Sequence, residues 1–126
     1  MLVALPPPVL EVFYSPTCAP CRLELPVLAQ IVERDGVRLR IVLLDQEQRA
    51  RDDIRKVSVT LEKVATPPSK LAPRRVLLLA DDTDGILPFA RSLLPSGKAC
   101  AVWRGRLTVL RARAMLAACI TAPSPR

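Results

Sequence analysis

Hydrophobic and polar positions change period several times along the chain, and each change predicts a new element. Short apolar or alternating runs predict strands, and apolar residues three or four apart predict helices. On this basis we expect strands at 9–14, 37–44, 76–80, 89–94 and 99–104. Helices are expected at 19–35, at about 46–65 and at 108–119. The order strand, helix, strand at the start indicates a right-handed crossover between two parallel strands.

The first two helices carry recognisable end signals. Pro26 lies inside the first helix and predicts a kink, and Gly36 is a suitable C-cap. Asp45 can cap the second helix, which the Thr66-Pro67-Pro68 segment ends. The apolar residues expected to face the core are Leu23, Val27, Leu28, Ile31 and Val32 in the first helix, and Ile54, Val57, Leu61 and Val64 in the second.

Two segments in the second half have alternative interpretations. The run 76–80 favours a strand over a buried helix, and the acidic segment 81–85 favours a turn over a calcium loop that would need further ligands. Further on, 95–98 is the expected turn of a hairpin, and Thr108 can cap the last helix. The apolar stripe expected on that helix is Leu110, Ala114, Met115, Ala118 and Cys119.

Composition indicates a globular chain with an aliphatic core. Of the 126 residues, 50% are hydrophobic but only 3% are aromatic. The length fits a single domain over 1–126, with a proline-rich N-terminal segment at 1–8 and a tail at 121–126. No apolar run approaches the roughly 18 residues of a membrane-spanning helix, so we expect no stable membrane insertion.

The chain is basic, with a net charge of +7 from 19 basic and 12 acidic residues. Such a charge can attract nucleic acid. The arginines are scattered, however, and only Tyr14 and Trp103 could offer a ring for stacking on a base. We therefore expect a solvated basic surface and no nucleic-acid partner.

Two cysteines, Cys18 and Cys21, stand where the first strand gives way to the first helix. The first turn of a helix has unpaired N–H groups and a positive dipole end, and both favour an anion. Cys18 should therefore ionise readily, and the thiolate is the reactive form of cysteine. Cys21, one turn further on, is placed to attack a mixed disulfide formed on Cys18.

A structural zinc site and an inert pair of core cysteines are the two alternatives. Zinc needs about four ligands. The chain has no histidine, and Cys100 and Cys119 are single cysteines 19 residues apart, so no metal is expected. An inert buried pair requires two cysteines to fall at this junction by chance. The redox interpretation is favoured over both.

These features together resemble the thioredoxin superfamily over nearly the whole chain. The resemblance rests on the Cys-Ala-Pro-Cys motif at 18–21, on Pro26 five residues later, on Asp45 after the next strand and on the proline–hairpin–glycine–helix ending. It implies an α/β, thioredoxin-like fold. In this fold a central mixed sheet of four to five strands is flanked by helices, here with a shortened N-terminus.

The resemblance also implies a cis-proline beside the cysteines. Pro88 matches that place best, and Pro73 is the rival. A cis bond would turn the backbone of Leu87 toward an extended substrate strand. Leu87, Pro88 and Thr17, which stands where thioredoxin has tryptophan, are therefore the expected substrate groove.

Two departures from thioredoxin change the expected chemistry. Thioredoxin's buried acid in the active strand is replaced here by Val12, and the adjacent Glu11 should face the other side of the strand. The connector between Asp45 and Pro88 is longer than in thioredoxin. In this respect the chain is more similar to periplasmic thioredoxin-like reductases of cytochrome c maturation and related thiol pathways.

Cys100 and Cys119 fall on the last strand and the last helix, which should pack together. A structural disulfide between them would need α-carbons within about 7 Å and an oxidising compartment. Two small unbonded core residues are the alternative.

The resulting hypothesis is an enzyme, a thiol-disulfide oxidoreductase acting on protein substrates and favoured as a reductant. Cys18 attacks, Cys21 resolves, Ala19 and Pro20 tune the redox potential, and no cofactor is needed. Expected partners are protein thiols or disulfides and a redox partner protein, and the chain is taken as a monomer. The expected compartment is periplasmic or otherwise extracytoplasmic, with the cytoplasm as the alternative. The alternative function is a non-catalytic or redox-regulated binding module within a larger assembly.

Overall fold

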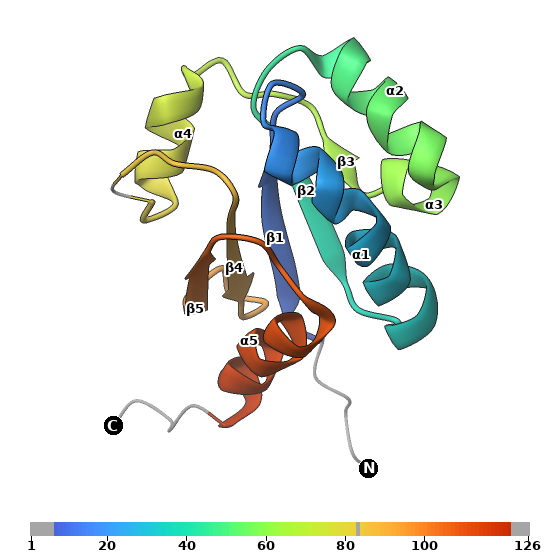
Figure 1. Ribbon diagram of the computed structural model, residues 1–126. Helices are drawn as coiled ribbons and strands as arrows, with labels where there is room; N and C mark the ends of the chain where they lie inside the picture. The colour runs from blue at the N-terminus through green and yellow to red at the C-terminus, as the bar shows by residue number, and fades with distance from the viewer. Residues whose placement is uncertain (1–6, 83, 122–126) are drawn as a thin grey trace.

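The computed structural model describes residues 7–82 and 84–121 and has a mixed five-stranded sheet at its centre (Figure 1). The strands are β1 (Val9–Tyr14), β2 (Leu39–Leu43), β3 (Ala65–Thr66), β4 (Phe89–Leu93) and β5 (Ala99–Arg104). Their order in the sheet is β3-β2-β1-β4-β5. β1 pairs with β2 in parallel and with β4 in antiparallel orientation, which places β1 at the centre.

Helices cover both faces of this sheet. They are α1 (Ala19–Asp35), α2 (Glu47–Val57), α3 (Val59–Glu62), α4 (Pro73–Leu79) and α5 (Val109–Thr121). α1 and α5 lie against one face, which we call the α1 face, and α4 lies against the other, the α4 face (Figure 1). None of the described helices is long and apolar enough to cross a bilayer.

The central strand supplies both cores because its side chains alternate between the faces. Leu10, Val12 and Tyr14 belong to the larger core on the α1 face. Phe13 belongs to the smaller core on the α4 face, where its ring lies 5.6 Å from that of Phe89. The thioredoxin-like fold class, the mixed sheet and the parallel β1–β2 pairing are thus confirmed.

The last third of the chain also forms as the sequence predicts. The hairpin arms are β4 and β5, and the N–H of Arg111 donates to Thr108 Oγ1 at 3.1 Å, which caps α5. The predicted strand at 37–44 is observed over Leu39–Leu43. Parts of three predicted segments fall outside the described residues, namely 1–6, Thr83 and 122–126.

The predicted strand at 76–80 is wrong, because this run is the body of helix α4. Pro73 occupies the first helical turn, where its missing N–H costs nothing. Leu77 and Ala80, three residues apart, are buried, while Leu78 and Leu79 are exposed. That spacing is helical, but in so short an apolar run it does not show in the sequence pattern.

The single helix predicted at about 46–65 is also wrong, because it is broken at Ser58. Ser58 is extended, with φ of −161°, and its hydroxyl accepts the N–H of Leu61 to start α3. Asp45 does not cap α2. The cap position is Gln46, which makes no side-chain capping bond, while Asp45 accepts a hydrogen bond from Ser15.

Predicted core residues in three helices point to solvent, and one of them is Val57 of α2, which is 41% exposed. Leu23 in α1 is 61% exposed and Leu110 in α5 is 77% exposed. Their places in the core are taken by Glu24 and Ala112. Other members of the predicted stripes are buried as expected.

Candidate redox site

Cys18 is the residue that caps the N-terminus of α1. Its backbone is extended, and its Sγ accepts the N–H of Cys21 at 3.2 Å. The N–H of Cys18 in turn donates to the carbonyl of Ser15 at 3.0 Å, which fixes the turn before the helix. A backbone N–H of the first helical turn, which would otherwise be unpaired, therefore points at this sulfur. The positive end of the helix dipole lies at the same place.

The two sulfurs of the motif are joined in a disulfide and differ in accessibility. The α-carbons of Cys18 and Cys21 are 5.2 Å apart. Cys18 is partly exposed, whereas Cys21 is only 3% exposed and belongs to the core on the α1 face. An incoming thiolate can therefore reach Cys18, while Cys21 is shielded behind it.

The peptide bond between Leu87 and Pro88 is cis. The carbonyl of Pro88 accepts the N–H of Gly105 at 3.0 Å, which anchors the loop to the end of β5. The rival, Pro73, begins α4. Leu87 and Thr17 line one pocket together with Pro73, whereas Pro88 and Cys18 are not among its lining residues.

A chain of hydrogen bonds connects Thr17 to the end of β2. The Ser15 hydroxyl donates to Asp45 Oδ1 at 2.8 Å, and the Ser15 and Thr17 hydroxyl oxygens are 2.9 Å apart. Asp45 therefore holds the turn in front of Cys18. The sequence predicted that this carboxylate caps the next helix, whereas the structure shows it bound to Ser15.

Glu24 is a candidate functional residue that the sequence interpretation missed. It is 2% exposed and follows Cys21 by three residues in α1, so the two side chains lie on the same face of the helix. One of its oxygens, Oε2, accepts the N–H of Leu107 at 3.1 Å. A signal was present, because a glutamate between Cys21 and Leu28 interrupts an otherwise apolar helical stripe.

Burial raises the pKa of the Glu24 carboxyl from 4.5 to about 7. The Leu107 hydrogen bond and the charge of Arg106 act in the opposite direction, but burial outweighs them. A carboxyl that titrates near neutral pH can both accept and return a proton there. Glu24 is thus a buried carboxyl that titrates near neutral pH, whereas the active strand carries Val12 where thioredoxin has its buried acid.

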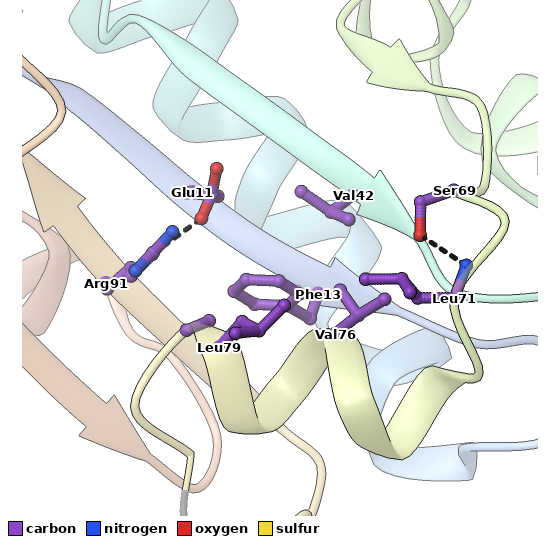
Figure 2. A pocket seen from close by; sticks show the side chains of 9 residues that line it. Glu11, Phe13, Val42, Ser69, Leu71, Val76, Leu79 and Arg91 are labelled. Carbon is purple, nitrogen blue, oxygen red and sulfur yellow. Dashed lines mark hydrogen bonds and ion pairs between the residues drawn. The ribbon is translucent and has the colours of Figure 1, made fainter.

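Glu11 is buried on the α4 face, as expected. Its carboxylate accepts hydrogen bonds from Arg91 Nε at 2.7 Å and from Arg40 Nε at 2.8 Å. Figure 2 shows Glu11 and Arg91 at one side of a cavity of about 270 Å³, with Phe13, Val76 and Leu79 forming an apolar wall. Cys18 and Cys21 do not line this cavity.

The other two cysteines form a second disulfide. Cys100 of β5 and Cys119 of α5 are joined, with α-carbons 5.1 Å apart. Among the described residues no cysteine is free, and no cluster of three or more histidine, cysteine, aspartate or glutamate side chains could hold a metal ion.

Solved structures with the same fold include several thiol-disulfide enzymes. A thioredoxin-related protein from Neisseria meningitidis serogroup B matches with a TM-score of 0.70 and 17% identity over 88% of this chain and 83% of its own. A thio-disulfide isomerase from Thermus thermophilus matches with a TM-score of 0.60 and 22% identity over 88% of this chain and 78% of its own.

A secreted thiol-disulfide isomerase from Corynebacterium glutamicum matches with a TM-score of 0.65 and 17% identity over 87% of this chain and 68% of its own. No protein-family model matches the sequence, and no curated protein matches it. The structural matches show that the chain has the thioredoxin-like fold.

Proposed function

We propose that this protein is a thiol-disulfide oxidoreductase that exchanges disulfides with protein substrates through Cys18 and Cys21. One observation carries the proposal: a partly exposed sulfur caps a helix and accepts a backbone N–H, with its buried partner directly behind it. That arrangement stabilises a thiolate at Cys18 and protects the resolving thiol. The fold, shared with known thiol-disulfide enzymes, agrees with this role.

In the first step the Cys18 thiolate attacks one sulfur of a substrate disulfide. A bond forms between the two sulfurs, and the other substrate sulfur leaves as a thiolate. The N–H of Cys21 and the N-terminus of α1 stabilise the anion on Cys18 before the attack. Ala19 and Pro20 lie exposed in the first turn of α1, where they set the redox potential together with this hydrogen bond.

In the second step Cys21 must lose its proton before it can attack the mixed disulfide. Its burial disfavours a thiolate, because the charged form is poorly solvated there. Glu24, one turn further along the same face of α1 and with a pKa of about 7, accepts the proton. The Cys21 thiolate then attacks Cys18 Sγ, the disulfide closes, and the substrate leaves reduced.

The substrate backbone lies along Leu87 and Pro88, and Thr17, which shares a pocket with Leu87, completes the groove. The Leu87 backbone is next to the cis bond and can pair with an extended peptide. We assign the protein the reducing direction, and the Ala-Pro pair between the cysteines is the feature that favours it.

We further propose an extracytoplasmic location. A second disulfide persists best in an oxidising compartment. Similar structures include a secreted thiol-disulfide isomerase and a pneumococcal protein described as an exposed lipoprotein thioredoxin.

The test is insulin reduction with dithiothreitol as the electron donor. We expect Cys18→Ser to reduce the rate to the uncatalysed background, because Cys18 is the partly exposed sulfur at the helix cap and Cys21 is buried. The matched control is the double variant Cys100→Ser/Cys119→Ser, which keeps the motif and should retain most activity. Equal rates for wild type and Cys18→Ser would disprove the enzyme function and favour a binding module. A reduction potential above about −150 mV would contradict the reducing direction alone.

A further inference from the structure

The pocket lined in part by Thr17 and Leu87 also contains charged side chains, and the exchange of protein disulfides does not require them. It has a volume of about 310 Å³ and an apolar floor that includes Leu44 and Leu77. Its polar lining includes Asp45, Arg74 and Asp84. Thr17, which directly precedes Cys18, and Leu87, which directly precedes the cis-proline, both line this pocket, whereas Cys18 itself does not. The residue next to the attacking sulfur thus forms part of the pocket wall.

Arg74 is an exposed cation without an ion-pair partner among the described residues. The aliphatic part of its side chain lies against Gly85, where a Cβ atom would come within 3.5 Å of Arg74 Cγ. The guanidinium is thus available to an anion in the pocket. A planar guanidinium binds a carboxylate through two parallel hydrogen bonds.

Asp45 supplies the opposite charge in the same pocket. One of its oxygens accepts the Ser15 hydroxyl, and within residues 7–82 and 84–121 no cation pairs with it. The third charged group, Asp84, is already paired with Arg104 at 3.1 Å. The pocket therefore presents one available guanidinium and one available carboxylate, which do not pair with each other.

We propose that this pocket binds the amino-acid group of a zwitterionic low-molecular-weight disulfide such as cystine, which the protein reduces in addition to protein disulfides. The ligand's α-carboxylate pairs with Arg74 and its α-ammonium pairs with Asp45, while its sulfur points to Cys18. A cysteine inside a protein chain has neither free group, so the pocket distinguishes the small disulfide from a protein substrate. This inference rests on the proposed function, because it uses the same two cysteines.

The reaction balances with the dithiol form of the protein. The Cys18 thiolate attacks one cystine sulfur, the cystine disulfide bond breaks, and one cysteine leaves as a thiolate. The Cys21 thiolate then attacks Cys18 Sγ and releases the second cysteine. The protein loses two electrons and two protons, and cystine gains both to become two molecules of cysteine.

The first experiment compares four disulfides in single-turnover oxidation of the reduced protein. Cystine carries both charges, cystamine only the ammonium, dithiodipropionate only the carboxylate, and hydroxyethyl disulfide neither. Each rate constant is divided by the rate of the same disulfide with dithiothreitol, which removes intrinsic reactivity. We expect the corrected value for cystine to exceed that for hydroxyethyl disulfide by about tenfold or more, since two charge-assisted contacts form.

The second experiment removes each charge in turn. Arg74→Gln should lower the cystine rate by about tenfold and leave the cystamine rate unchanged. Asp45→Asn keeps an acceptor for Ser15 and should lower the rates with cystine and cystamine but not with dithiodipropionate. The matched control is Arg75→Gln, which removes a neighbouring exposed charge of α4 that does not line the pocket.

Corrected rates that are equal for all four disulfides would overturn the inference, as would an equal loss in Arg75→Gln and Arg74→Gln. The neutral disulfide separates this failure from failure of the proposed function. If hydroxyethyl disulfide oxidises the wild type but not Cys18→Ser, the oxidoreductase function stands without the pocket. If no disulfide reacts in a manner that depends on Cys18, both proposals fail.

Discussion

Two glutamates are buried on opposite faces of the same sheet, and they differ in the groups that bind their carboxylates. On the α4 face, both oxygens of Glu11 are held by arginines, Arg40 and Arg91. On the α1 face, Glu24 receives a single backbone N–H from Leu107 and has no ion pair among the described residues. The first charge is compensated by two guanidiniums, whereas the second is left to titrate near pH 7.

This difference shows that burial alone does not identify a functional acid. A buried carboxylate between two arginines holds strands together, because its charge is balanced in place. A buried carboxyl with one neutral donor is costly when charged, and that cost brings its pKa into the range where proton transfer is useful. Only Glu24 also lies on the same helix face as Cys21.

The largest effect should come from removing the proton acceptor while keeping the shape. Glu24→Gln should slow the release of a mixed disulfide on Cys18 by about 100-fold, the lower range of general acid–base effects. Glu11→Gln is the matched control and should change this rate by less than about threefold. Rapid-mixing kinetics with quenched intermediates measures the step. Similar rates for both variants would remove the functional distinction between the two glutamates.

The second effect is a pH dependence of the unfolding free energy, which the titration of Glu24 causes. Its folded pKa of about 7 lies above the unfolded value of 4.5, so the folded state binds the proton more tightly. Protonated Glu24 therefore contributes roughly 3 kcal/mol to the unfolding free energy. This contribution is fully present below about pH 4.5 and is lost as pH rises through 7. Urea unfolding at pH 4.5 and pH 8 measures it. Glu24→Gln should flatten this dependence, and an unchanged slope would contradict the assignment.

The third effect concerns the α4 face. Arg91→Met keeps the aliphatic stem but leaves Glu11 with Arg40 alone, whose side chain is 43% exposed. We expect a loss of about 2 kcal/mol in unfolding free energy, below the value for complete removal of a buried partner. Arg113→Met breaks the more exposed pair with Asp35 and should cost less than about 1 kcal/mol. Equal losses of unfolding free energy in Arg91→Met and Arg113→Met would mean that the burial of Glu11 does not strengthen its ion pair with Arg91.

The smallest effect tests the support of the Glu24 donor. Thr108 caps α5 and directly follows Leu107, whose N–H binds Glu24. Thr108→Ala should lower the unfolding free energy by about 1 kcal/mol, and Thr108→Ser by only a few tenths. Thermal unfolding distinguishes the two variants. If Thr108→Ser loses as much unfolding free energy as Thr108→Ala, the effect comes from packing of the Thr108 methyl group and not from capping.

The features that sequence could predict are those decided by neighbouring residues. The position of Cys18 before a helix, the hairpin and the Thr108 cap depend on a few adjacent side chains. The alternation of β1 is equally local, and it correctly placed Glu11 on the face opposite Val12.

The features that sequence missed depend on contacts between distant segments. Glu24 interrupts the apolar stripe of its helix, but the partner that holds its carboxyl, the N–H of Leu107, lies 83 positions away and cannot be read from that local pattern. The break at Ser58 is stabilised by the hydroxyl's contact with Glu33 of α1. The charged pocket combines four segments, and nothing in the local pattern around Arg74 or Asp45 indicates that they meet.

The lone tryptophan gives this protein an intrinsic optical probe of the loop that binds Glu24. The Trp103 indole stacks under the Arg111 guanidinium at 3.9 Å and donates its N–H to the carbonyl of Arg106, the residue before the Glu24 donor. Movement of that loop during titration or disulfide exchange would alter the environment of the fluorophore. Its emission can therefore follow turnover in real time without any attached label.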